Sequence, residues 1–210
     1  MIGKLQRGLE ELYRLEPELP VGNFLVTEEA RDAAGVARSP REQLLVSEDS
    51  EGLSIGLYFD AEVLQSASGQ DPAQLMRGQG FGDFLMLVEG VSHFVYLAFR
   101  ATANRSLSAL ELELQAEVDK YVTCLLSGDH SGARSQTLRQ RLFCQVEYDD
   151  DLDPQEQDRY RVANNNALTY SKSLERRFVR SGSIGEMLIE LRRFYRMSLQ
   201  SKMHHIRQAA

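Results

Sequence analysis

The stretch from Phe84 to Phe99 constrains the fold more than any other part of this 210-residue chain. It is apolar almost all the way round at helical spacing, which is typical of a helix buried in a protein core. Two ionisable residues, Glu89 and His93, interrupt it; they lie one helical turn apart and therefore share a face. A core helix that carries such groups needs polar partners for them elsewhere in the chain.

A second central helix is predicted directly after the first. Residues Ser108–Glu111 have the sequence Ser-Ala-Leu-Glu, the capping-box pattern that marks a helix start. The alternation over Leu110–Leu114 has the period of a strand, but Glu, Leu, Gln and Ala are good helix formers, so the sequence favours a helix. We therefore expect residues 83–127 to form an antiparallel helical hairpin around which the rest of the chain packs.

The N-terminal part is predicted to contain a helix and a β-hairpin. Apolar residues at spacings of three and four predict an amphipathic helix over Ile2–Leu15. Gln43–Ser47 and Leu53–Phe59 flank a polar segment of about five residues that contains a glycine, which predicts an antiparallel hairpin. Because a lone two-stranded hairpin is marginally stable, it needs to pack on helices or to find a third strand, for which residues 24–26 are the candidate.

The C-terminal part is predicted to form two long antiparallel helices, over residues 160–178 and 184–199, with a second capping box at Ser183 and Glu186. The expected fold class is therefore α+β and predominantly α: a helical bundle with a small N-terminal antiparallel β-hairpin. Residues 1–153 would form an acidic core and residues 154–210 a basic helical hairpin packed on it, within one continuous structural domain.

The charge is distributed unevenly along the chain. The net charge is −7, but residues 154–210 carry 11 Lys and Arg against 5 Asp and Glu, a net of +6, which leaves −13 for the remainder. Such polarity indicates either intramolecular complementarity, which we favour, or an oriented role toward a partner. The two cysteines lack the spacing of a disulfide framework or a zinc knuckle, and the most apolar run is short and contains Glu89 and His93. We expect a cytoplasmic protein with no membrane association.

The candidate metal ligands are Glu89, His93 and Glu117. If the two central helices are antiparallel and rise equally per residue, Glu117 lies within a turn of His93, and Gly90 would let the two helix backbones approach closely. The functional interpretation is a metal site or a general acid–base pair. The structural interpretation, which the sequence favours, is a satisfied polar cluster that sets helix register, because core ionisable groups need partners wherever they occur. No cofactor is expected on this interpretation.

The basic C-terminal helices offer a candidate surface for an anionic partner, formed by Arg176, Arg180, Arg192, Arg193 and Arg196. Aromatic residues are not interleaved with them as single-strand binding requires, so an ordinary solvated helix face is favoured. His204 and His205 are expected to lie in an exposed tail. The acidic connector around Asp149–Asp153 lacks the spacing of a calcium loop.

The chain contains no phosphate-binding loop, nucleophile elbow or His-Glu-x-x-His motif, and an enzyme is therefore not favoured. The sequence favours a non-enzymatic interaction, regulatory or adaptor subunit in a cytoplasmic complex, with a protein partner or as a homodimer. One alternative is nucleic-acid or polyanion binding through the basic helices. A further alternative is a metal-dependent enzyme that uses Glu89, His93 and Glu117.

Overall fold

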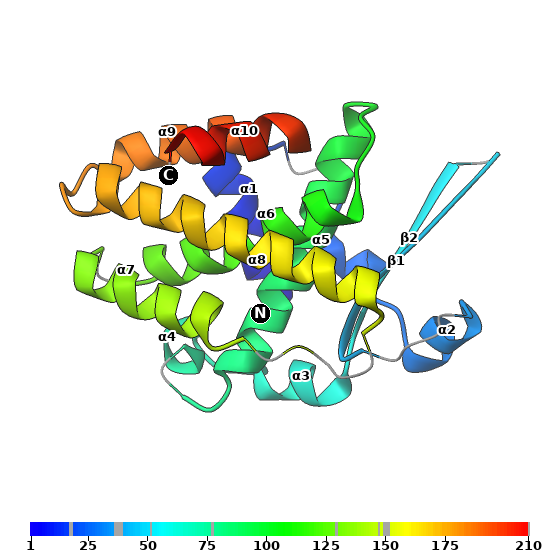
Figure 1. Ribbon diagram of the computed structural model, residues 1–210. Helices are drawn as coiled ribbons and strands as arrows, with labels where there is room; N and C mark the ends of the chain where they lie inside the picture. Colours follow the sequence, from blue (N-terminus) through cyan, green and yellow to red (C-terminus); the bar gives the residue numbers. More distant parts are fainter. Residues whose placement is uncertain are drawn as a thin grey trace.

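The computed structural model describes residues 1–16, 19–35, 40–50, 52–76, 78–128, 130–146, 148 and 152–209. The chain forms a helical body from which one β-hairpin projects (Figure 1). The elements follow in the order α1 (Ile2–Tyr13), η1 (Val21–Phe24), α2 (Glu28–Ala33), β1 (Glu42–Asp49), β2 (Gly52–Phe59), α3 (Ala61–Ser66), α4 (Pro72–Leu75), α5 (Phe81–Thr102), α6 (Ala109–Leu126), α7 (Gly132–Arg139), η2 (Gln140–Cys144), α8 (Pro154–Leu174), η3 (Glu175–Val179), α9 (Ile184–Tyr195) and α10 (Leu199–Ala209). The predicted fold class, predominantly α with a small antiparallel hairpin, is confirmed.

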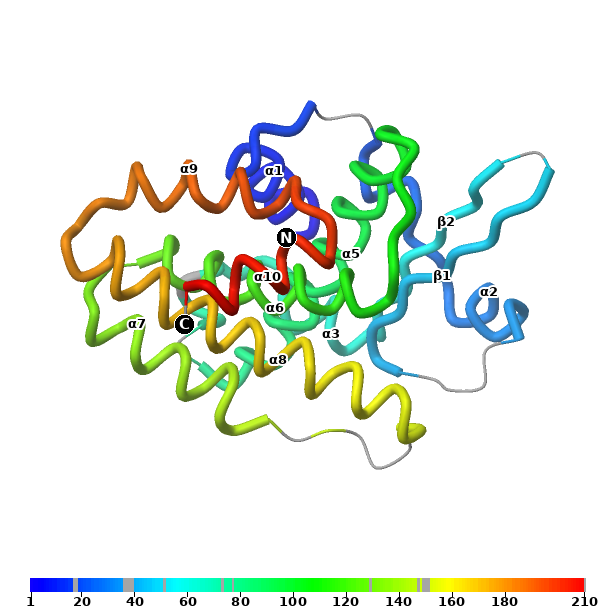
Figure 2. The backbone as a smooth tube through the Cα atoms, turned by 45° about the horizontal axis from the view of Figure 1, so that its top comes forward, coloured from blue at the N-terminus to red at the C-terminus, as the bar shows by residue number. Residues whose placement is uncertain are grey.

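Helices α5 and α6 form the centre of the body, as the sequence predicts. They pack against each other, α1 covers another side of α5, and α8 covers α6 (Figures 1 and 2). Because α6 is covered from two sides, its carboxylates at Glu111 and Glu113 are buried, whereas runs of Glu on helices usually face solvent. By length and composition alone α5 could cross a membrane, but most of its apolar stretch is buried inside the protein, as in any core helix.

The β-hairpin is confirmed, with strands longer than expected. β1 and β2 pair in antiparallel register from Glu42 opposite Phe59 to Asp49 opposite Gly52, so the strands extend into the segment predicted as a loop. The candidate third strand amounts to one parallel bridge, in which Leu25 lies opposite Leu57. This segment follows directly on the 3₁₀ turn η1, which leaves too few extended residues for a full strand.

The helix caps agree with the sequence in part. Ser108 accepts a hydrogen bond from the Glu111 N–H and starts α6, but the Glu111 carboxylate accepts from Tyr96 and does not complete the capping box. The side chain of Ser183 makes no capping bond to the described residues, so the second predicted box is not formed. A complete capping box starts α8 instead, with Asp153 as its N-cap.

The C-terminal segment differs from the prediction in its last third. The helix predicted over residues 184–199 breaks after Tyr195, and α10 turns back onto the body. Lys202 and Ile206 on α10 are buried, so the predicted exposed tail is wrong; only part of α10, including His204, faces solvent. One hydrophobic core runs through residues of both the acidic and the basic segment.

Candidate metal-binding site

The candidate site lies where the first residue of β1 meets the facing sides of α5 and α6. Helix α5 presents Glu89 and His93 one turn apart, and α6 presents Glu113. One ligand atom from each of these three residues lies within 4.8 Å of the other two. Among the described residues, this is the single group of three His, Cys, Asp or Glu side chains close enough together to hold a metal ion. Glu42 from β1 lies on the other side of the His93 ring.

The His93 imidazole lies between two carboxylates without hydrogen bonding to either. Its Nε2 atom is 3.5 Å from Glu113 Oε2 and its Nδ1 atom is 3.6 Å from Glu42 Oε1. His93 is 7% exposed, and neither Nε2 nor Glu42 Oε1 has a hydrogen-bond partner among the described residues. A buried polar atom without a hydrogen bond lowers the stability of a protein by about 1–3 kcal/mol. The metal-free protein therefore carries this free-energy cost at the His93 site.

The electrostatics of the site are dominated by its carboxylates. Burial alone would lower the pKa of His93, but Glu113 and Glu42 raise that pKa well above its usual value. Burial raises the pKa of Glu42, and the attraction of His93 opposes this change. The site therefore favours a cation between its carboxylates. In the metal-free protein the imidazolium ring of His93 supplies part of that positive charge.

Lys120 on α6 supplies a second cation. Its Nζ atom donates to Glu89 at 3.0 Å and to Glu117 at 2.7 Å. Glu117 was predicted to lie beside His93; the structure places Glu113 there, and Glu117 one helical turn further along α6, next to Lys120. The two residues share a face of α6, so the offset between the helices decides which of them reaches His93.

Gly90 lets another element approach α5 closely, but that element is the β-hairpin and not, as the sequence predicted, α6. A Cβ at Gly90 would lie 2.6 Å from the Phe59 ring and 2.8 Å from Glu42 Oε1. The prediction that Gly90 brings α5 and α6 together is therefore wrong: it lets the hairpin pack directly on α5. This contact carries Glu42, which is distant in sequence from the helices, to the His93 ring.

A second buried polar cluster, which sequence reasoning missed, joins α1, α5, α6 and α10. Asp119 accepts hydrogen bonds from Tyr13, Ser92 and Gln115. Lys202 donates to Gln115 and to the hydroxyl of Tyr96, which donates to Glu111. Lys202 lies three residues after Leu199 and four before Ile206, on the apolar face of its helix, and that position was the available signal. This cluster is sealed in the core, so we assign it a structural role.

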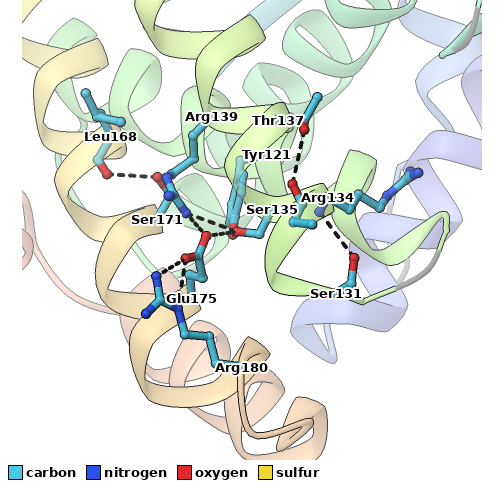
Figure 3. A network of polar contacts seen from close by, with 11 residues as sticks. Tyr121, Ser131, Arg134, Ser135, Thr137, Arg139, Leu168, Ser171, Glu175 and Arg180 are labelled. Atoms are coloured by element: carbon cyan, nitrogen blue, oxygen red, sulfur yellow. Dashed lines mark hydrogen bonds and ion pairs between the residues drawn. The ribbon is translucent and has the colours of Figure 1, made fainter.

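The five arginines predicted to bind an anion lie on or beside α9 and η3, and four of them make intramolecular bonds. Arg192 and Arg196 donate to backbone carbonyls at the C-terminal end of α1, and Arg176 donates to a carbonyl of α10. Arg180 pairs with Glu175, which also accepts from Ser135 and Arg139 (Figure 3). Arg193 is exposed.

The remaining sequence candidates are placed as follows. His205 pairs with Glu190 on α9, and the acidic connector predicted around Asp149–Asp153 falls mostly outside the described residues.

Comparisons of the chain with protein-family models, with curated proteins and with solved structures gave no match. The site geometry therefore carries the functional argument alone.

Proposed function

We propose that the protein binds a divalent transition-metal ion through Glu89, Glu113 and the Nε2 atom of His93. The observation that carries this proposal is the His93 ring itself. Its buried Nε2 atom lacks a hydrogen bond among the described residues and is directed at a carboxylate of the facing helix. Imidazole nitrogen and carboxylate oxygen are the ligands by which proteins commonly hold zinc, iron and manganese.

The arrangement around the ring also fits a metal-bound histidine. A histidine that binds a metal through one nitrogen almost always donates its other N–H to a carboxylate, a carbonyl or water. Glu42 lies 3.6 Å from Nδ1 and is positioned for this second role. The ligand atoms now lie up to 4.8 Å apart, so closing on an ion with bonds of about 2.0–2.2 Å needs small inward rotations of the two Glu side chains. The ion also displaces the Nε2 proton of His93 into solvent, because only a deprotonated ring nitrogen binds a metal.

The donor set indicates the class of ion. One nitrogen and two carboxylate ligands suit Zn²⁺, Mn²⁺, Fe²⁺ or Co²⁺ better than Ca²⁺, which takes six to eight oxygen ligands, or Mg²⁺. Three protein ligands leave coordination positions for water, which is the arrangement of catalytic rather than structural sites. The Glu89 side chain is 23% exposed, so the site borders solvent and an ion can reach it.

The test is metal binding by the purified protein after treatment with a chelator. We expect about one equivalent of Co²⁺ or Mn²⁺ to bind in calorimetry, with a change in the visible Co²⁺ absorption that reports the coordination geometry of the bound ion. His93→Gln should lose this binding, while His204→Gln, which alters an exposed histidine, should retain it. Absence of binding by the wild-type protein, or equal binding by His93→Gln, would refute the proposal.

A second candidate function, protein interaction, is favoured by the projecting hairpin (Figure 1). Val46 and Leu53 are 48% and 40% exposed. Both point to the same side of the hairpin, because Val46 lies opposite Ile55 and residues two apart on a strand share a face. Near the tip of the hairpin Glu48 and Asp49 are exposed, and residues 43–58 contain no Lys or Arg. We propose that this face receives a basic, apolar segment of another protein; two acidic hairpins of the same chain would repel each other.

A photo-crosslinking residue at position 46, compared with one at exposed Gln200, would test this second function in the source cells. We expect a crosslink specific to position 46 whose attachment site maps to a Lys- or Arg-rich segment of the partner. Crosslinks shared by both positions, or mapped to an acidic segment, would count against it.

A further inference from the structure

The carboxylate cluster around His93 contains more negative charge than one divalent ion neutralises. Glu42, Glu89, Glu113 and Glu117 contribute four carboxylates, of which Glu89 belongs both to the His93 group and to the Lys120 ion pair. Glu117 interacts electrostatically with Glu89 and Glu113 as well as with Lys120. The four groups therefore form one cluster with two positions suited to a cation: one beside His93, which is the proposed metal position, and one between Glu89 and Glu117, where the Lys120 ammonium group lies.

The second of these places is already occupied by a side chain. We propose that the Lys120 ammonium group fills a second cation position of the metal site, between Glu89 and Glu117, and thereby limits the protein to one divalent ion. This inference rests on the proposed metal-binding function and adds to it the stoichiometry of the site and the residue that sets it. On this view Lys120 is an internal substitute for a second metal ion.

The geometry at Lys120 fits this role. Nζ lies 3.0 Å from Glu89 Oε2 and 2.7 Å from Glu117 Oε1, and its side chain is 11% exposed. Metal–carboxylate bonds of about 2.0–2.2 Å are shorter than these contacts by less than about 1 Å, so modest side-chain rotations would bring both carboxylates onto an ion. Glu89 would then lie between the two positions, as a carboxylate that bridges two metal ions does.

The charge state of the lysine fits as well. Burial alone would lower the pKa of Lys120, but the carboxylates of Glu117 and Glu89 raise that pKa above its usual value. The same ammonium group lowers the pKa of Glu89 against the effect of burial. The two ion-pair contacts, to Glu89 and to Glu117, hold the ammonium group in this position, and a divalent ion entering the position would have to displace it.

The experiment compares the number of Mn²⁺ ions bound by the full-length wild-type protein and by three variants. Lys120→Met removes the charge but keeps much of the side-chain volume, Lys120→Arg keeps the charge, and Lys172→Met alters an exposed lysine as the matched control. We expect one ion per chain for the wild type, Lys120→Arg and Lys172→Met, and two for Lys120→Met. Because Glu89 would bridge the two ions, the paramagnetic resonance spectrum of Lys120→Met should show magnetic coupling between them.

The possible results separate this inference from the proposed function. If the wild type binds no metal, the proposed function fails, and the inference fails with it. If the wild type binds one ion and Lys120→Met also binds one while retaining its helical circular dichroism, only the inference fails. Two ions in the wild type would overturn it too, because Lys120 would then exclude nothing. Should Lys120→Met not fold, Lys120→Gln serves as the uncharged variant with the same expected count.

Discussion

Replacement of Lys202 by Met should change how the stability of the protein depends on pH. Lys202 is 0% exposed, and its Nζ atom donates to Gln115 and Tyr96. Burial lowers its pKa from 10.5 to about 7, although the carboxylates of Glu111 and Asp119 favour the charged form. The amine is therefore mostly neutral in the folded protein above pH 7.5 and still protonated in the unfolded chain.

The sign of the effect follows from proton binding. Between pH 7 and 10.5 the unfolded chain binds a proton at Lys202 that the folded protein has released, so the free energy of unfolding rises with pH. Integrated from pH 7.5 to 9.5, this single group contributes a rise of about 2.5 kcal/mol. Lys202→Met removes the titrating group, so the variant should lack this rise.

The assay is urea unfolding followed by far-UV circular dichroism at pH 7.5, 8.5 and 9.5; the chain has no Trp for fluorescence. At each pH the free energy of unfolding of Lys202→Met is subtracted from that of the wild type. The quantity to compare is the change in this difference from pH 7.5 to pH 9.5. Groups that titrate alike in both proteins cancel in that difference. Lys172→Met is the control and should follow the wild type. Parallel curves for wild type and Lys202→Met would refute the reasoning, since Lys202 would then keep its proton in the folded state.

Three further predictions concern packing and metal affinity. Gly90→Ala should destabilise the protein by about 1–3 kcal/mol, measured by urea unfolding, because the added Cβ meets the Phe59 ring; an unchanged midpoint would contradict the contact. Glu42→Gln should weaken metal binding by about 10–100-fold in calorimetry, because the amide orients the His93 ring less strongly; unchanged affinity would remove Glu42 from the site. Arg192→Ala should lower the free energy of unfolding by about 1 kcal/mol, because the variant loses the hydrogen bond from Arg192 to the last turn of α1. A variant that is as stable as the wild type but binds an anion less well would instead favour the role of Arg192 in an anion-binding surface.

Local features of the sequence predicted the helical frame. Apolar spacing predicts α1 and α5 and is present in the chain before any tertiary contact forms. The Ser108 cap predicts the start of α6 for the same reason, because a capping bond joins residues three apart. Where a helix end depends on packing, as at the break between α9 and α10, the apolar stripe continued past it and the prediction failed.

The sequence by itself determined that Glu89 and His93 share one helix face, because residues four apart on a helix always lie on the same side. It also determined that both side chains need polar partners, because the face that carries them is apolar and buried. Only the tertiary structure decided which partners they find. A shift of one turn between α5 and α6 selects Glu113 rather than Glu117, and the hairpin brings Glu42 to His93 because Gly90 leaves room for it. Helical periodicity is a property of neighbouring residues, whereas the offset between two helices is set by the packing of the whole core.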